Sequence, residues 1–267
     1  LFHVSMLGNR VLNYHPVCTF IPKLMRIINK RVLNEVVANA TIWGADLAAL
    51  FLPRHCAGCD TGLNRNEECL CLACLEDLPR TRYHEDPSNP VEQLFWGKVP
   101  IHAASAFLHF ARSGVTQRML HRLKYKKDHD VGSMLGGLMA TELRDSPRFG
   151  SVDAFIPVPL HPKKERIRGF NQSKLLVEGM NKVWPKPMLN DQLLRVVQTT
   201  TQTRRGRLDR WTNVKEAFHI PDPVALQGLH VLLVDDVVTT GATIEGCVKA
   251  LAVVPRIKVS LFTAACA

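Results

Sequence analysis

The chain has 267 residues, of which 46% are hydrophobic and 22% are charged, the balance of an ordinary soluble globular protein rather than of a compositionally specialised class. This length allows one domain with an appendage, or two small domains. The formal net charge of +10 is unusual, and it favours anionic partners: a polyphosphate substrate, a nucleic acid or an acidic protein.

The N-terminal region contains no compact apolar core followed by a small-residue cleavage site, so no secretory signal is indicated. Residues 36–52 are rich in apolar side chains, but Asn39, Gly44 and Asp46 interrupt them. An amphipathic or buried helix is therefore favoured over a membrane span. We expect residues 1–50 to form an N-terminal extension and helix, in a cytoplasmic protein without a membrane span.

Residues 51–80 contain five of the eight cysteines, in the segment HCAGCDTGLNRNEECLCLACLEDLP. Two Cys-x-x-Cys knuckles would together complete a tetrahedral site with no open position, which is typical of a structural zinc ion. The predicted metal ligands are Cys56, Cys59, Cys71 and Cys74. Cys69 is a spare that could replace Cys71, and His55 is a weaker candidate. The alternative is a pair of disulfides, but these need an oxidising compartment, and nothing else in the sequence suggests export.

The next segment, residues 81–90, is polar with two prolines and is interpreted as a linker. A second domain is predicted over residues 95–267. Its first elements are a strand in AASAFLHF, a helix over Gly114–Tyr125 with apolar residues at helical spacing, and a helix over Val131–Leu143.

A strand is predicted at Phe155–Val158, followed by a basic, proline-bearing loop from Pro159 to Gly169. Asn171 is a plausible N-cap for a helix that begins at Gln172. A basic loop at the end of a strand suits a pyrophosphate group or a second substrate, whereas the simpler interpretation is an exposed turn. The candidate residues of this loop are Lys163, Lys164, Arg166, Arg168 and Asn171.

The segment HVLLVDDVVTTGATIEGC carries the main functional signal. Its run VLLV does not alternate, so it predicts a strand buried on both faces, as in a parallel sheet. Asp235 and Asp236 come at the end of this strand, a small-residue loop follows, and Ile244–Leu251 has a helical pattern. In open α/β sheets, ligands bind at that edge of the strands.

The small-residue loop and the acid pair suit two parts of one ligand. Backbone N–H groups at a helix N-terminus, with threonine hydroxyls beside them, can surround a phosphate. Adjacent carboxylates would repel a phosphate, but they accept hydrogen bonds from vicinal sugar hydroxyls and can help to hold Mg²⁺. The segment therefore predicts a site for a ribose with a 5′-phosphate. Its residues are Asp235, Asp236, Val237, Thr239, Thr240, Gly241, Ala242 and Thr243.

The sequence has two alternative interpretations besides this ligand site. A P-loop ATPase would need Gly-x-x-x-x-Gly-Lys-Ser/Thr, but Gly241 and Gly246 are followed by Cys247 and Val248. The simpler alternative is a buried strand that ends in a solvated acidic turn. The TTGAT sequence favours the phosphate–ribose site, because it resembles the 5-phosphoribosyl-1-pyrophosphate (PRPP) loop of the type I phosphoribosyltransferases.

From about residue 50 to residue 267, the chain resembles the ComF family, which includes competence proteins of DNA uptake. Four motifs carry the resemblance: the double knuckle running into LACLEDLP, HRLKYKKDHDVG, PVPLHPKKERIRGFNQS, and VLLVDDVVTTGAT. A weaker match is LLRVVQTTTQTRRGRLDRWTNVKEAF, in which Val197 and Arg205 depart from the family pattern. These departures leave the surface around that segment, and any second-substrate preference it sets, undecided.

The resemblance implies an α/β fold: a parallel sheet with flanking helices, like that of the type I phosphoribosyltransferases, preceded by a small Cys₄ zinc module. It also implies that Asp235 and Asp236 hold the ribose hydroxyls and that residues 239–243 hold the 5′-phosphate. Arg168 and the basic loop would approach the pyrophosphate or the second substrate. Asp235, Asp236 and Arg168 are thus the candidate catalytic residues, with Mg²⁺ bound alongside PRPP.

The resemblance favours a PRPP-binding protein of DNA uptake, and it leaves catalysis open, since no residue stands out as a general base. One alternative is a non-catalytic module that binds single-stranded DNA or a competence helicase and keeps a relic or regulatory PRPP site. A metabolic phosphoribosyltransferase is a further alternative. Clustered basic residues support an extended anionic ligand, although each cluster alone suits a solvated face. They are Arg112, Arg118, Arg122, Lys124, Lys126 and Lys127; Lys163, Lys164, Arg166 and Arg168; and Arg204, Arg205, Arg207 and Arg210.

Overall fold

The computed structural model describes residues 54–267, except for residues 126–127 and 197–216. The predictions for residues 1–50, for most of the weaker family match and for the third basic cluster lie outside the described residues. Residues 55–267 belong to one compact unit.

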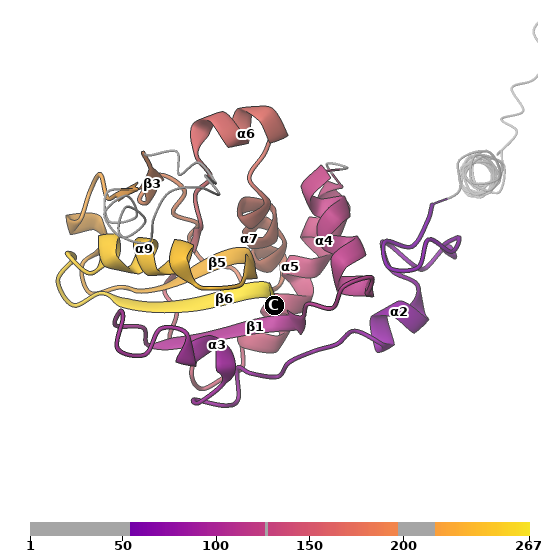
Figure 1. Cartoon of the computed structure of the whole chain (residues 1–267), viewed down its shortest axis with the longest axis horizontal. Coiled ribbons are helices and arrows are strands. Elements are labelled where there is room, and N and C mark those ends of the chain that lie inside the picture. Colours follow the sequence, from indigo (N-terminus) through magenta and orange to yellow (C-terminus); the bar gives the residue numbers. More distant parts are fainter. Residues whose placement is uncertain (1–53, 126–127, 197–216) are drawn as a thin grey trace, which may run out of the picture. The chain divides into compact units, whose positions relative to one another are not determined.

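A four-stranded parallel sheet forms the centre of this unit (Figure 1). Its strands are β1 (Ala103–His109), β2 (Ala154–Pro157), β5 (His230–Val238) and β6 (Lys258–Cys266), in the order β1-β6-β5-β2. All three strand pairs are parallel, so the carboxyl ends of the strands lie at one edge. The expected parallel sheet with flanking helices is confirmed.

Alternate residues of each strand face two separate hydrophobic cores. On one face, the core contains Phe155, Leu232 and Phe262 together with apolar residues of α4 (Val115–Tyr125), α5 (His129–Leu143) and α7 (Gln172–Val183). On the other face, the core contains Ile156, Leu233 and Leu261 together with residues of α3 (Pro90–Gln93) and α9 (Ala242–Leu251). Burial on both faces explains why the strand sequences are apolar without alternation.

The smaller elements add a few residues to these cores: Cys74 to the first, and Phe218 and Leu226 to the second. They are α2 (Leu72–Glu76), α6 (Pro162–Arg168), the 3₁₀ helix η2 (Val224–Leu226), and a two-stranded antiparallel sheet of β3 (Leu194–Arg195) and β4 (Phe218–His219).

The region predicted as a basic loop contains the helix α6, so the loop prediction is wrong for residues 162–168. Local signals produce this helix: Pro162 lies in its first turn, the side chain of His161 accepts a hydrogen bond from the Lys163 N–H, and Gly169 ends it with a φ of 85°. None of its residues is buried. Its sequence therefore has no apolar face that would have predicted a helix.

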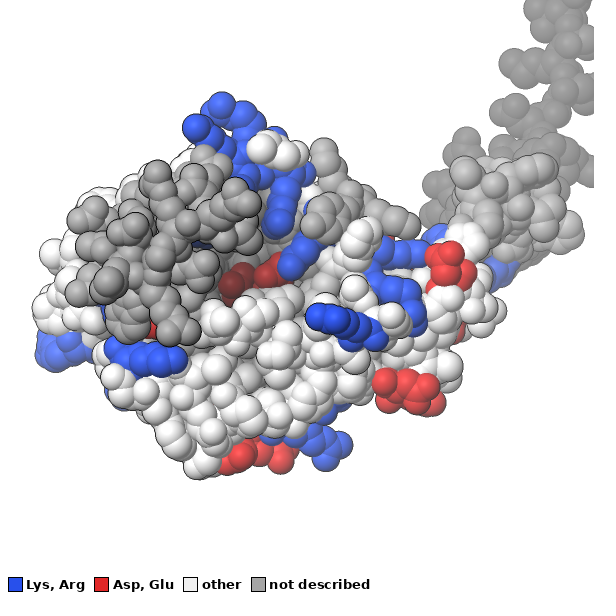
Figure 2. All heavy atoms as spheres, viewed as in Figure 1, with Lys and Arg blue, Asp and Glu red and all other residues white. Residues whose placement is uncertain are grey.

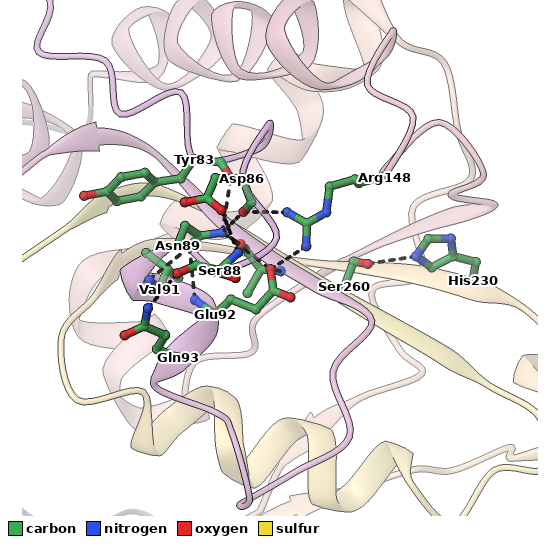
Figure 3. A network of polar contacts seen from close by, with 11 residues as sticks. Tyr83, Asp86, Ser88, Asn89, Val91, Glu92, Gln93, Arg148, His230 and Ser260 are labelled. Atoms are coloured by element: carbon green, nitrogen blue, oxygen red, sulfur yellow. Dashed lines mark hydrogen bonds and ion pairs between the residues drawn. The ribbon is translucent and has the colours of Figure 1, made fainter.

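The polar segment interpreted as a linker is packed against the sheet. The Thr81 N–H donates to the Phe107 carbonyl at 3.0 Å. Asn89 is fully buried and donates to the Ala104 carbonyl of β1 at 2.9 Å. Figure 3 shows Arg148 pointing toward Asp86 of this segment and toward Glu92 of α3, and its guanidinium donates to the Asp86 carbonyl and to the Glu92 carboxylate. These hydrogen bonds hold the segment in place, which a free linker would not require.

Candidate functional site

The acid pair lies at the carboxyl edge of the sheet, within the last residues of β5. The strand continues beyond the apolar run, because Asp235 pairs with Thr263 and Val237 pairs with Ala265 of the equally long β6. The acids therefore belong to the strand itself instead of following its end. Asp235, Asp236 and Val237 are all partly accessible, whereas the four residues before them are buried.

Asp235 is held by the neighbouring helix α7. Its Oδ1 atom accepts hydrogen bonds from the Ser173 hydroxyl and from the Asp236 N–H, both at 2.9 Å. Burial of the carboxylate, followed by the negative charge of Asp236, raises the pKa of Asp235 to about 7. Near neutral pH, this carboxyl group can therefore exchange a proton or accept hydrogen bonds from a ligand.

Asp236 is paired with a lysine that is distant from it in the sequence. Lys124 of α4 places its Nζ atom 2.8 Å from Asp236 Oδ2, and the Val237 N–H donates to Oδ1 at 2.7 Å. The sequence predicted no role for Lys124 at this site. Its signals were membership of a basic cluster on the predicted helix and a place in the HRLKYKKDHDVG motif.

The small-residue loop joins β5 directly to the N-terminus of α9. Gly241 has a φ of 76°, and a Cβ atom at this position would lie 2.8 Å from the Phe95 ring, so only glycine fits without strain. Thr239, Thr240 and Ala242 are exposed around it. Because the first N–H groups of a helix have no partner within the helix, those of α9 are oriented toward this exposed loop.

The predicted basic residues of the second-substrate region lie on α6, which follows β2, the neighbour of β5. Arg168 donates to the Gln172 side chain at 2.8 Å. Within the described residues, Lys163, Lys164, Arg166 and Arg168 form no hydrogen bond or ion pair with the acid pair. In Figure 2, basic side chains project at the top of the molecule, and acidic side chains lie in a hollow with basic side chains beside it.

Asn171 has contacts that position α7. Its side chain accepts a hydrogen bond from the Ser173 N–H and donates to the Val158 carbonyl, both at 3.0 Å. The predicted N-cap is confirmed. Because Ser173 in turn holds Asp235, Asn171 connects the end of β2 to the acid pair through one helical turn.

The four predicted zinc ligands are brought together. The Sγ atoms of Cys56, Cys59, Cys71 and Cys74 all lie within 4.8 Å of one another, and those of Cys59 and Cys71 are 3.7 Å apart. Zn–S bonds of about 2.3 Å in a tetrahedron place sulfur atoms about 3.8 Å apart, so four thiols within 4.8 Å of one another could hold a zinc ion.

Hydrogen bonds to the sulfur atoms also fit metal ligation. The N–H groups of Gly58 and Cys71 both donate to Cys56 Sγ at 3.3 Å. Hydrogen bonds from Thr61 lower the pKa of the Cys59 thiol to about 6. Such bonds favour the thiolate, which is the form that binds a metal. Cys69 and His55 lie outside this group of four.

Among the described residues, no helix combines the length and the apolar composition needed to cross a membrane.

The chain matches no protein-family model. It is 33% identical over 129 residues to the DNA utilization protein YhgH of Escherichia coli K12, an alignment that covers 47% of this chain and 56% of the relative. It is 33% identical over 137 residues to competence protein F of Haemophilus influenzae, covering 50% and 60%. Competence protein ComFC of Bacillus subtilis is 27% identical over 96 residues, covering 36% and 37%. The chain thus spans about half the length of the first two relatives.

Solved structures include a hypoxanthine phosphoribosyltransferase from Staphylococcus aureus, which matches 52% of this chain and 63% of its own with 12% identity and a TM-score of 0.29. A likeness this low carries no argument about function.

Proposed function

We propose that the chain is a member of the ComF family, that it binds PRPP and that it acts in DNA uptake; its similarity to YhgH and competence protein F over about half of its length supports this. One observation carries the ligand assignment: an acid pair, a glycine-containing loop and a helix N-terminus follow one another at the carboxyl edge of a parallel sheet. This is the edge at which open α/β sheets bind ligands.

In this proposal, Asp235 and Asp236 accept hydrogen bonds from the two ribose hydroxyls, with Val237 beside them. The loop from Thr239 to Thr243 receives the 5′-phosphate, because the amides and the positive dipole end of α9 favour an anion. The raised pKa of Asp235 adds a pH dependence, since a protonated carboxyl loses acceptor capacity.

The bases of α6 would serve the pyrophosphate part of the ligand, and Arg168 is the closest of them in sequence to the helix that holds Asp235. Mg²⁺, held by the acid pair and by ligand oxygens, would supply charge neutralisation for the pyrophosphate. If the protein is an enzyme, pyrophosphate leaves the anomeric carbon through an oxocarbenium-like transition state. The protein then mainly positions the ligand and stabilises the leaving group.

A second candidate function is binding of single-stranded DNA, with or without a helicase partner. The net charge of +10 and the relatives named for competence and DNA utilization favour it. The two functions are compatible, because a nucleic acid could be an acceptor or an effector. An affinity for single strands that falls steeply with salt would support it, and an affinity that does not change with salt would contradict it.

The first test is calorimetric titration of PRPP with Mg²⁺ into the intact chain and into Asp235→Asn/Asp236→Asn. We expect binding to the unchanged chain, and loss of binding in the variant. The matched control is Asp145→Asn/Asp191→Asn, which changes two exposed acids outside the site and should bind as the unchanged chain does. Absence of binding to the unchanged chain at millimolar PRPP would refute the proposal.

A further inference from the structure

One helix contacts both the cysteine cluster and the acid pair. The N-terminal part of α4 lies against the first knuckle, and Lys124, in its last turn, pairs with Asp236. The two ends of this contact path are separated by only a few residues of α4. A change at one end therefore has a short and continuous route to the other.

The contact with the knuckle consists mainly of two arginines that bind backbone carbonyls. Arg118 donates to the Gly58 carbonyl, and Arg122 donates to the His55 carbonyl at 3.1 Å and to Asp60 Oδ1 at 2.7 Å. These acceptors flank Cys56 and Cys59 on the same loop. A 330 Å³ cavity beside these contacts is lined by Cys56 and Ala57 of the knuckle and by Arg118 and Arg122 of α4.

Gly58 brings the knuckle and the start of α4 into direct contact. A Cβ atom on Gly58 would lie 2.8 Å from Cys74 Sγ and 3.0 Å from Val115 Cγ1. The knuckle backbone is thus in close contact with a metal ligand on one side and with α4 on the other. Any movement of the knuckle away from its metal-bound geometry changes the surface on which α4 rests.

At the other end of α4, Lys124 contributes positive charge where two carboxylates adjoin. The side chains of Lys124 and Asp236 are only 26% and 16% exposed, so solvent screens their interaction less than that of a surface pair. A phosphorylated ligand brings further negative charge to this edge. Without Lys124, the two carboxylates of the acid pair would repel each other more strongly. Both would also repel the phosphates of the ligand.

We propose that α4 couples the metal state of the cysteine cluster to the acid pair, with Lys124 as the positioning residue that transmits the coupling. Metal bound by the four cysteines orders the knuckle, the knuckle carbonyls hold Arg118 and Arg122, and α4 then keeps Lys124 at Asp236. Loss of the metal releases this chain of contacts, because small metal modules owe most of their order to the ion. The affinity measurements that test this inference use PRPP as the ligand, so they rest on the proposed function.

The main test measures PRPP affinity in the unchanged chain and in Lys124→Ala, each with zinc and after chelation. We expect chelation to weaken binding about tenfold in the unchanged chain, which is within the usual range of coupling between sites. Lys124→Ala should bind weakly in both states, with a zinc effect below about twofold, because the coupling residue is absent. An equal zinc effect in both proteins would overturn the proposal.

A second variant avoids unfolding of the cysteine module. Arg122→Ala keeps all four cysteines, so its zinc content should equal that of the unchanged chain in a chelator release assay. Its PRPP affinity should nevertheless fall severalfold, toward that of Lys124→Ala. Arg144→Ala and Lys182→Ala remove an exposed arginine after α5 and a lysine near the end of α7, and both should leave affinity unchanged. Unchanged affinity in Arg122→Ala would contradict the coupling.

Hydrogen exchange tests the coupling without PRPP. In the intact chain, chelation should speed exchange of the α4 amides from Met119 to Tyr125, and Arg122→Ala should do the same with zinc bound. Exchange in α9, whose buried residues belong to the other hydrophobic core, serves as the internal control. If PRPP fails to bind but α4 responds, only the proposed ligand is wrong. If α4 exchange is insensitive to zinc, the coupling is wrong whatever PRPP does.

Discussion

The titratable groups at the two ends of strand β5 have opposite environments. At its first residue, His230 is 3% exposed, and its two ring nitrogens lie 2.8 Å from the hydroxyls of Ser151 and Ser260. Figure 3 shows the contact with Ser260. Burial, followed by the nearby His102, lowers the pKa of His230 to about 4, so this histidine is neutral and fully hydrogen-bonded. Its environment favours a stable fold.

At the other end of the strand, Asp235 and Asp236 are adjacent acids whose mutual repulsion and burial raise the pKa of Asp235 to about 7. In the described part of the chain, Lys124 is the cation that forms an ion pair with them. A sheet edge designed only for stability would not place two carboxylates together. The difference supports the proposal that this edge binds a ligand, because functional sites commonly retain unfavourable electrostatics.

The largest expected effect on stability comes from substitution of His230, at the start of β5. His230→Ala leaves a cavity and leaves the buried hydroxyl of Ser260 without its histidine partner, and it should lower the free energy of unfolding by about 3 kcal/mol. Urea denaturation measures this loss, and PRPP affinity at a temperature where the variant is folded should not change. His219→Ala, on the exposed side of β4, is the control and should change stability by less than about 0.5 kcal/mol.

The pH dependence of stability should have opposite signs at His230 and at Asp235, near the two ends of β5. The pKa of His230 is lowered in the folded state, so between about pH 6.5 and pH 4 the unfolded chain binds the extra proton and stability falls as pH falls. This histidine should account for a loss of up to about 3 kcal/mol across that window. The loss is found by comparing urea denaturation of the unchanged chain and of His230→Ala at each pH. Parallel curves for the two proteins would show that His230 is not the group that titrates.

The sequence predicted the sheet and the longer helices because they bury apolar residues in regular patterns. Leu232 and Leu233, for example, face opposite cores, which is why their strand is apolar without alternation. The helix α6 was missed because caps at His161 and Gly169 define it, while Ile167 remains 84% exposed. Local capping in a proline-bearing basic segment resembles turn chemistry, and periodicity does not separate the two.

The polar contacts could not be predicted, because they join residues that are distant in sequence. The burial of Asn89 depends on the carbonyl of Ala104, and the pairing of Lys124 with Asp236 depends on how α4 packs on the sheet. The acid pair was predictable because its residues and its loop are contiguous. The cysteine cluster was predictable because the spacing within each knuckle is local.

Substitution of Asp235, near the carboxyl end of β5, should increase stability. Asp235→Asn removes one of two adjacent charges while its side-chain oxygen can still accept from Ser173, and it should raise the free energy of unfolding by about 1–2 kcal/mol at pH 8. The gain should vanish as pH falls toward 4. The folded-state pKa of Asp235 is raised to about 7. Ionisation of this carboxyl group therefore destabilises the unchanged chain only as the pH rises from about 4 to about 7. Urea denaturation at both pH values gives the sign of the stability change in Asp235→Asn. A loss of stability at pH 8 would show that the ionised carboxylate does not destabilise the fold.

The smallest expected effect tests whether Lys124 offsets the repulsion at this end. Lys124→Ala removes the partner of Asp236 and should lower the free energy of unfolding by about 1 kcal/mol at pH 8, since the pair is partly shielded from solvent. In an Asp236→Asn background, the same substitution should cost less than about half as much, because the repulsion it offsets is gone. Denaturation of the four proteins in this cycle gives the interaction energy directly. Equal costs in both backgrounds would mean that Lys124 stabilises α4 by packing alone, and that the carboxyl edge tolerates its two acids without a counter-charge.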